Sequence, residues 1–468
     1  MENILNLTFM VIAMIIIFLT TIKYYNKTKK LDTFVFFSIG YLLYYFVIPM
    51  LIIFLIGNNV DPHNRFSYRI VNSYPEQHSF AILTSLISYM FFMVFFIINS
   101  KIKINMRKIN SKDSRLNYNQ SKFIKKTNVI EIFAWLLFIV SFFAEIYIII
   151  KLGGVSNALT QIEPLRSGSI EKTTYLRTNL LFLFTIYPWI HGATFLFFLI
   201  YRIKRNKLNL VMFIISISGS IYALLLSGGR LQIILFVLCF FYDYVRKKYK
   251  HHILMMILIS IIILVFLSGI DDLFFYLTHG YRPTWSSNNL GSVFEEFAFP
   301  YANILSVKEM NEIYGLRYGI DFIGWITYLV PSKVLSLLNI KRVDHGYDLI
   351  TLFHNGPNSH RGGVPTDLFT LGYRQFGMLG IFFTMLFYSI ICVVINRITN
   401  KITDNKYTFI YIRISMLLFI MIPYADLENF IRSHFSTIIL AFAVSYIFPS
   451  TSKVTVKEEK QEVILYEE

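Results

Sequence analysis

The densest group of polar side chains that could do chemistry lies in residues 354–380, HNGPNSHRGGVPTDLFTLGYRQFGMLG. His360 and Asp367 are candidate general bases, since each can accept a proton from a hydroxyl group within hydrogen-bond reach. Gly362 and Gly363 would let a substrate approach the backbone closely. The same residues also fit a polar loop with a helix-capping aspartate and a solvated histidine. The spacing alone leaves both interpretations open.

A second group consists of arginines in connecting segments between apolar runs. A guanidinium group suits phosphate because its planar fork donates two parallel hydrogen bonds and stays charged at any relevant pH. These residues predict a site that binds an anion. They are Arg166, Arg177, Arg230, Arg282, Arg361 and Arg374.

The turn SGGR, residues 227–230, joins two apolar runs. Its two glycines allow a tight fold with exposed amide donors, and Arg230 would lie at the depth of lipid headgroups. This combination could bind a lipid phosphate or diphosphate. A snorkelling arginine that caps a helical hairpin and contacts bulk lipid explains the turn equally well.

The elements that must position these residues are membrane spans. The chain has 468 residues, of which 55% are hydrophobic and only 15% charged, whereas soluble domains carry about 25% charged residues. Apolar runs of about 20 residues match a bilayer core about 30 Å thick. We therefore expect an all-α, polytopic bundle of about eleven spans. They cover residues 3–22, 33–56, 79–100, 129–150, 178–201, 209–226, 231–245, 253–270, 377–396, 408–423 and 431–448.

The orientation of the bundle follows from the basic residues. Connections on one side hold 27 of the 44 Lys and Arg residues, while those on the other side are longer in total yet hold 15. The positive-inside rule makes the first side cytoplasmic, with the N-terminus outside and the C-terminus inside. The net charge of +16 is thereby explained without nucleic acid, which would need a clustered basic face beside stacking aromatics.

Domain organisation follows from the loops. Residues 1–270 hold eight spans and an outer loop at 151–177, residues 377–448 hold three spans, and residues 449–468 form a cytoplasmic tail. Between them, residues 271–376 form one outer segment, and loops of such length are usually functional. Within it, residues 320–338 are apolar, but Asp321, Pro331 and Lys333 favour a helix at the membrane surface or against the bundle.

The cysteines, the common sequence motifs and the ionisable residues within apolar runs give weaker indications of function. Cys239 and Cys392 both lie in apolar runs, so neither a disulfide framework nor a thiolate metal site is expected. Walker A, GxGxxG, HExxH, GxSxG and CxxC patterns do not occur, which leaves nucleotide hydrolysis, a Rossmann cofactor and a HExxH-type protease without motif support. No cofactor or metal is assigned, although metal sites built from acidic oxygens leave weak signatures. Glu145 and Arg413 fall inside apolar runs, where ionisable groups are functional candidates. Glu145 could join the outer site, whereas Arg413 lies near the inner end of its run and can snorkel.

Several of these features together resemble the Wzy-type O-antigen and oligosaccharide repeat-unit polymerases. They are the span number, the late outer loop, the GG pair at 153–154 followed by Arg166, the SGGR turn, and the pattern D-x6-R-x-F-G-x-x-G from Asp367 to Gly380. Many members of that family have Glu where this chain has Asp367, and a Y-x-N-F-G-like stretch where it has YRQFG.

The resemblance implies a glycosyltransferase at the outer face of the bacterial plasma (inner) membrane. Such an enzyme moves a growing polysaccharide from undecaprenyl diphosphate to a new lipid-linked oligosaccharide repeat unit. The outer arginines would stabilise the departing diphosphate without a metal, and His360 or Asp367 would deprotonate the acceptor. Tyr373 could stack against a sugar ring. Membrane lipid and a separate chain-length regulator are the partners implied.

Two alternatives stay open. An O-antigen ligase, or another lipid-linked glycosyltransferase, shares the layout of many spans and one large outer loop. A flippase or other transporter of lipid-linked oligosaccharide would show two related halves and charges inside the bundle. This chain gathers its polar residues in one outer segment instead, which favours an enzyme.

Overall fold

The computed structural model describes residues 2–57, 66–102, 120–161, 182–227, 230–248, 289–330, 332–340, 346–356, 364–402 and 407–448, with a few isolated positions between 165 and 276. Every regular element in this part of the chain is helical, which confirms the predicted all-α fold class. The first half contains α1 (Glu2–Thr28), α2 (Thr33–Leu42), the π-helix η1 (Leu43–Val47), α3 (Ile48–Gly57), α4 (Phe66–Ser73), η2 (Pro75–Gln77), α5 (His78–Lys101), α6 (Gln120–Lys151), α7 (Val155–Thr160), α9 (Leu183–Ile186), η6 (Tyr187–Trp189), α10 (Ile190–Lys204), α11 (Lys207–Leu226) and α12 (Arg230–Lys248). The second half contains α14 (Asn289–Tyr314), α15 (Ile320–Leu329), α16 (Ser332–Leu337), α17 (Gly346–Asn355), α18 (Leu368–Phe376), α19 (Met378–Thr399), α20 (Thr408–Ser415), α21 (Leu417–Met421) and α22 (Leu427–Ile447).

Seven helical stretches in the described residues are long and apolar enough to cross a bilayer. Each coincides with a predicted span. They are Leu5–Thr28, Thr33–Phe54, Pro75–Lys101, Lys125–Lys151, Leu183–Lys204, Lys207–Leu226 and Met378–Thr399. Three further predicted spans correspond to shorter apolar helices, Gln232–Tyr242, Thr408–Met421 and His434–Ile447. The span at 253–270 lies almost entirely outside the described residues, so the count of eleven and the orientation stay predictions.

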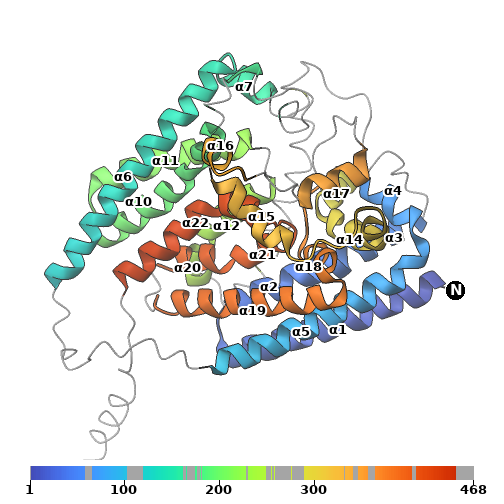
Figure 1. Cartoon of the computed structure of the whole chain (residues 1–468). Helices are drawn as coiled ribbons and strands as arrows, with labels where there is room; N and C mark the ends of the chain where they lie inside the picture. Colours follow the sequence, from blue (N-terminus) through green and yellow to red (C-terminus); the bar gives the residue numbers. More distant parts are fainter. Residues whose placement is uncertain are drawn as a thin grey trace, which may run out of the picture.

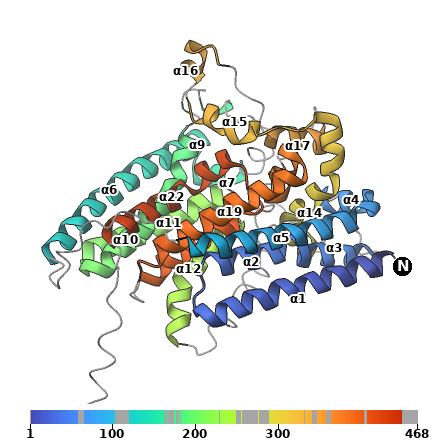
Figure 2. The same cartoon turned by 60° about the horizontal axis from the view of Figure 1, so that its bottom comes forward.

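The helices form two groups that meet along the middle of the molecule (Figure 1). One group contains α1, α2, α5, α14, α18 and α19, with α5 packed along α19 and α14 against α18. The other contains α6, α10, α11, α12, α20 and α22, with α10 packed between α6 and α11. Contacts of α21 with α2, and of α19 with α20 and α22, join the groups. A second view shows α1 and α5 on the opposite side of the molecule from α6 (Figure 2).

The second predicted span is not a uniform α-helix. It continues from α2 through η1 into α3, so one wide turn is inserted at its centre. Such π-type turns inside α-helices are frequent at functional sites. Here the wide turn carries Tyr44 and Tyr45, both buried.

The last part of the predicted outer segment is packed into the bundle. The middle of α14 is buried from Phe297 to Val307, and the helix contacts α3, α4 and α18. Residues 320–338, expected as one helix, form the two short helices α15 and α16 with a break between Leu329 and Ser332. The sequence between these two helices contains a proline, a residue whose ring and missing N–H oppose a continuous helix.

The pattern ending in F-G-x-x-G encodes a tight turn between α18 and α19. Gly377 adopts φ 60° and ψ −136°, a backbone conformation that side chains disfavour. The two helices then cross at Gly372 and Gly380. A Cβ atom on Gly380 would lie 1.9 Å from the carbonyl oxygen of Gly372. Only glycine fits at this crossing, and the crossing sets the direction in which α18 presents its side chains.

Candidate functional site

The structure brings three of the predicted site residues together on one short helix. Asp367 precedes α18, and Tyr373 and Arg374 lie in its second half. Arg230 begins α12, but its side chain is not among those described. The other predicted residues, Arg166, Arg177, Arg282, His360 and Arg361, lie outside the described residues.

Asp367 is the N-cap of α18 and has no exposed surface. Its Oδ1 accepts hydrogen bonds from the backbone N–H groups of Phe369 at 3.0 Å and Thr370 at 3.1 Å. The hydroxyl of Tyr45, from the wide turn of η1, donates to the same oxygen at 2.8 Å. The helix-capping interpretation of Asp367 is therefore confirmed, while its catalytic role stays a prediction. Capping satisfies amide donors that the first turn of a helix leaves open.

The second carboxylate oxygen of Asp367, Oδ2, is connected to His354 through the side chain of Asn303. Asn303 of α14 donates from Nδ2 to Asp367 Oδ2 at 3.1 Å and to the carbonyl oxygen of Pro365 at 2.9 Å. The Oδ1 of Asn303 lies 3.1 Å from Nε2 of His354, at the end of α17. We call Tyr45, Asn303, His354 and Asp367 the Asp367 network. Its members come from four helical elements and are all buried.

Backbone hydrogen bonds hold the segment before α18 in place. The N–H of Val364 donates to Oγ1 of Thr351 on α17 at 2.9 Å. The N–H of Leu368 donates to the carbonyl oxygen of Ile422, and that of Ala425 to Thr366, both at 2.8 Å. The position of Asp367 therefore depends on α17 and on the segment that follows α21.

Burial sets the electrostatics of Asp367. Loss of hydration raises the pKa of its carboxyl group above the ordinary value, and hydrogen bonds from Thr370, Tyr45 and Asn303 offset part of that rise. A buried, fully hydrogen-bonded carboxyl group can orient the imidazole of His354 through the amide of Asn303, without being exposed to the reacting group. This arrangement suits His354 as a proton acceptor better than Asp367 itself.

Arg374, at the other end of α18, is also buried, with 1% of its surface exposed. Burial lowers the pKa of its guanidinium group to about 10, and the nearby charge of Asp321 partly opposes the shift. Arg374 therefore remains a cation at neutral pH, enclosed by protein.

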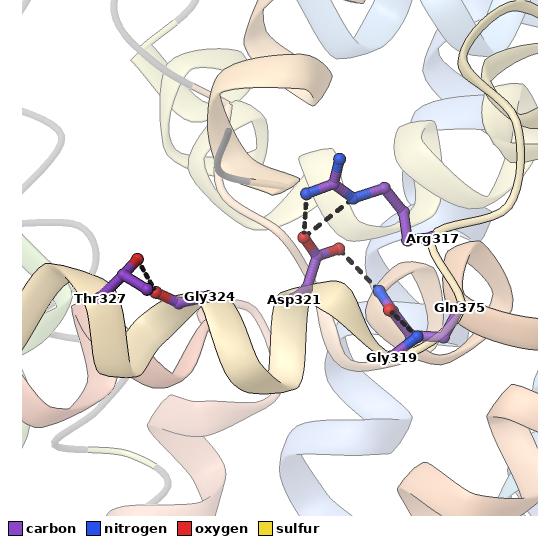
Figure 3. A network of polar contacts seen from close by, with 6 residues as sticks. All are labelled: Arg317, Gly319, Asp321, Gly324, Thr327 and Gln375. Carbon is purple, nitrogen blue, oxygen red and sulfur yellow. Dashed lines mark hydrogen bonds and ion pairs between the residues drawn. The ribbon is translucent and has the colours of Figure 1, made fainter. Parts of the chain in front are cut away.

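A polar network joins Arg317, Asp321 and Gln375, the residue that follows Arg374 in the sequence (Figure 3). Arg317 donates from Nε and Nη2 to Oδ1 of Asp321 at 3.0 and 2.7 Å, and Gln375 Nε2 donates to Oδ2 at 2.6 Å. The N–H of Gly319 donates to Oε1 of Gln375 at 3.0 Å. The N–H of Arg317 also donates to the carbonyl oxygen of Arg374 at 2.8 Å. These contacts fasten the start of α15 to the end of α18.

Tyr373 lies on an aromatic face that continues onto α5. Its ring stacks on that of Phe369, with centroids 5.9 Å apart, and meets Phe80 edge to face at 5.8 Å. The ammonium group of Lys308 lies 3.8 Å from the centroid of Phe80. A cation and aromatic rings at the boundary of the bundle could contact a polar ring, as predicted for Tyr373.

The sequence patterns did not single out Asn303, Tyr45 or His354 as site residues. No spacing rule connects residues 45, 303, 354 and 367, because tertiary packing alone brings their helices together. The structure also corrects the expectation that Arg413 snorkels, since it is buried, with 6% of its surface exposed. Glu145 of α6 is buried as well and lies beside Gly219 of α11. Both helices belong to the group that contains α10 and α12, whereas Asp367 lies in the other group.

Two findings in the described residues concern metal-binding groups and cysteines. Among the described residues, no three His, Cys, Asp or Glu side chains form a group that could hold a metal ion. Cys239 and Cys392 are both buried and free, as expected from their apolar runs.

Comparisons with known proteins give one partial similarity. The chain is 26% identical over 140 residues to a protein of Helicobacter pylori (strain J99 / ATCC 700824) named "Probable peptidoglycan glycosyltransferase FtsW". The match covers 26% of this chain and 31% of that relative, so it spans about a third of the relative's length. No family model matches the chain, and no solved structure matches it. The similarity is to part of that relative, and the described residues of this chain contain helices of membrane length.

Proposed function

We propose that this protein is a glycosyltransferase of the plasma membrane that joins lipid-linked oligosaccharide repeat units into a polysaccharide. The observation that carries the proposal is the buried Asp367 network. It connects Tyr45, on a helical stretch of membrane length, to the imidazole of His354 through Asp367 and Asn303. The partial similarity to a probable peptidoglycan glycosyltransferase supports the same class of reaction.

The proposed reaction needs a base for the acceptor hydroxyl. His354 is the candidate that the geometry favours, because Asn303 orients its imidazole and Asp367 orients Asn303. A positioned base contributes about a hundredfold to ten-thousandfold to such a step. Asp367 is then a positioning residue. His360, six residues further along the chain, is the second candidate base.

The reaction also needs positive charge where the diphosphate of the lipid departs. The sugar is already activated by its lipid, so a nucleotide-binding site is not required. Cations placed in a site that excludes water stabilise a developing anion more strongly than they would in water. We assign this role to Arg230 together with Arg166, Arg177, Arg282 and Arg361. Arg374 would contribute its buried positive charge from the end of α18.

A strain that lacks this chain and keeps the rest of its polysaccharide pathway tests the proposal. Its surface glycolipid, resolved on a gel, should collapse from a ladder to a single repeat unit, because export and ligation still work. Complete loss of repeats would refute the polymerase and point to a ligase or a flippase. Polymer that accumulates on its lipid carrier outside the membrane would single out the ligase.

A further inference from the structure

Arg413 is a buried cation that does not belong to the Asp367 network. It lies on α20, which packs against α12, α19 and α22. Ionisable side chains inside apolar helices are energetically expensive and are usually paired or functional. Arg413 forms no ion pair with any carboxylate in the described part of the chain.

An aromatic ring and two imidazoles lie in the region around the side chain of Arg413. Its guanidinium carbon lies 5.7 Å from the ring centroid of Phe195 on α10. His191 of α10 and His434 of α22 lie in the same part of the bundle, since a Cβ on Gly192, next to His191, would lie 3.2 Å from the Cβ of Ser436. The charge of Arg413 acts on both imidazoles. Each of these helices thus places an imidazole near the same buried positive charge.

Several hydrogen-bonding atoms in this region have no partner among the described residues. They include Nη1 of Arg413, Nδ1 of His191 and Oγ1 of Thr437. Thr437 follows His434 by three residues, so both lie on the same face of α22. Leaving such groups buried and unsatisfied costs about 1–3 kcal/mol each. A guanidinium, an imidazole and a hydroxyl can all donate to one anion, which would satisfy them together.

We propose that Arg413, His191 and His434, with Thr437, form a buried binding site for a phosphate group. The bidentate fork of a guanidinium matches phosphate oxygens, and neutral imidazole and hydroxyl groups donate further hydrogen bonds. The apolar helices around the site favour a phosphate carried on a lipid over a free one. The proposal rests on the proposed function only for the identity of that lipid, a polyprenyl diphosphate.

Three soluble probes separate the possible sources of the phosphate. Farnesyl diphosphate, inorganic diphosphate and farnesol are titrated against the purified full-length protein in detergent, and binding is followed by calorimetry. Farnesyl diphosphate should bind at least about tenfold more tightly than either other probe, since both halves of the ligand contribute. Inorganic diphosphate that binds as tightly as farnesyl diphosphate would overturn the lipid source. Binding of farnesyl diphosphate no tighter than that of farnesol would overturn the phosphate site.

Variants locate the site. Arg413→Met should weaken binding of farnesyl diphosphate by about tenfold or more, because it removes the buried charge-assisted hydrogen bonds. Arg413→Lys keeps the charge and should lose less. Arg397→Met is the matched control, since Arg397 lies in the last turn of α19 and donates to the carbonyl oxygen of Ile102. It should bind as the unchanged protein does.

The melting temperature separates this site from a structural role. A buried guanidinium without a counter-ion destabilises the fold, so Arg413→Met should melt no lower than the unchanged protein. If that variant fails to fold, His191→Phe removes one donor and should weaken binding about threefold to tenfold. Unchanged affinity in the folded variants overturns the proposal. The proposed function is judged separately, by the surface ladder.

Discussion

The amide of Asn303 connects Asp367 to His354, since its Nδ2 lies 3.1 Å from Asp367 Oδ2 and its Oδ1 lies 3.1 Å from His354 Nε2. Asn303 comes from α14 and Asp367 from the start of α18. The contact therefore couples the cap of one helix to the orientation of a histidine at the end of another.

The substitution Asp367→Asn distinguishes the role of Asp367 as a helix cap from the role of its negative charge. Asparagine caps a helix about as well as aspartate does, but its amide nitrogen would meet Nδ2 of Asn303, so the contact that orients His354 is lost. We expect elongation to fall by about tenfold to a hundredfold with normal membrane insertion. The measurement is the length distribution of the surface polysaccharide together with the amount of protein in membranes. Full-length polymer would show that Asp367 acts only as a cap.

The same substitution has a pH signature in stability. Burial raises the pKa of Asp367 in the folded protein, so the folded state binds a proton more strongly than the unfolded state. Its contribution to stability is then fully present below the unfolded pKa and is lost as pH rises through the folded pKa. The unchanged protein should lose melting temperature relative to Asp367→Asn as the pH rises from about 4, near the ordinary pKa of an aspartate carboxyl group, to about 7. A difference in melting temperature between the two proteins that is equal at both pH values would contradict the raised pKa of Asp367.

Replacement of the two candidate bases distinguishes them. His354→Gln should lower elongation by about a hundredfold or more, whereas His360→Ala should have a smaller effect. The assay is release of lipid diphosphate by purified protein, measured across pH. Should His360→Ala be the more damaging change, the base is His360 and the Asp367 network has a structural role.

Arg230→Ala should abolish elongation while expression and insertion stay normal, because the residue is assigned to the departing diphosphate. Arg397→Ala, in the last turn of α19, serves as the control and should elongate normally. An intact ladder from Arg230→Ala would remove Arg230 from the site and favour the snorkelling interpretation.

Gly380→Ala tests the crossing of α18 and α19. The added Cβ would lie 1.9 Å from the carbonyl oxygen of Gly372, so the helices must move apart at a cost of about 1–3 kcal/mol or more. Gly192→Ala is the milder comparison, since its nearest neighbour is the Cβ of Ser436 at 3.2 Å. We expect Gly380→Ala to melt clearly lower than Gly192→Ala. Equal melting temperatures would contradict the close approach.

The apolar runs predicted most of the helices, because membrane spans need about 20 apolar residues in sequence and that requirement is local. The cap at Asp367 and the turn at Gly377 were likewise visible as residue types that helix ends require. The crossing of α18 and α19 at Gly372 was not visible in the sequence. It depends on two helices approaching each other, and spacing within one helix carries no record of that approach.

The interior of the site could not be predicted for the same reason. Asn303 and His354 look like ordinary polar residues in the sequence, and only the packing of α14 against both α17 and α18 joins them to Asp367. Arg413 was misplaced because its position near one end of an apolar run favoured snorkelling. The helix α12, which packs against α20 and helps to bury Arg413, is distant from it in the sequence.

Purified full-length protein, supplied with a synthetic repeat unit on undecaprenyl diphosphate, tests the central claim most directly. Mass spectrometry of the products should find lipid-linked chains of two, three and more repeats, with one undecaprenyl diphosphate released for each linkage formed. Unchanged single repeats would contradict the account if a purified enzyme known to elongate the same substrate builds chains from it under the same conditions.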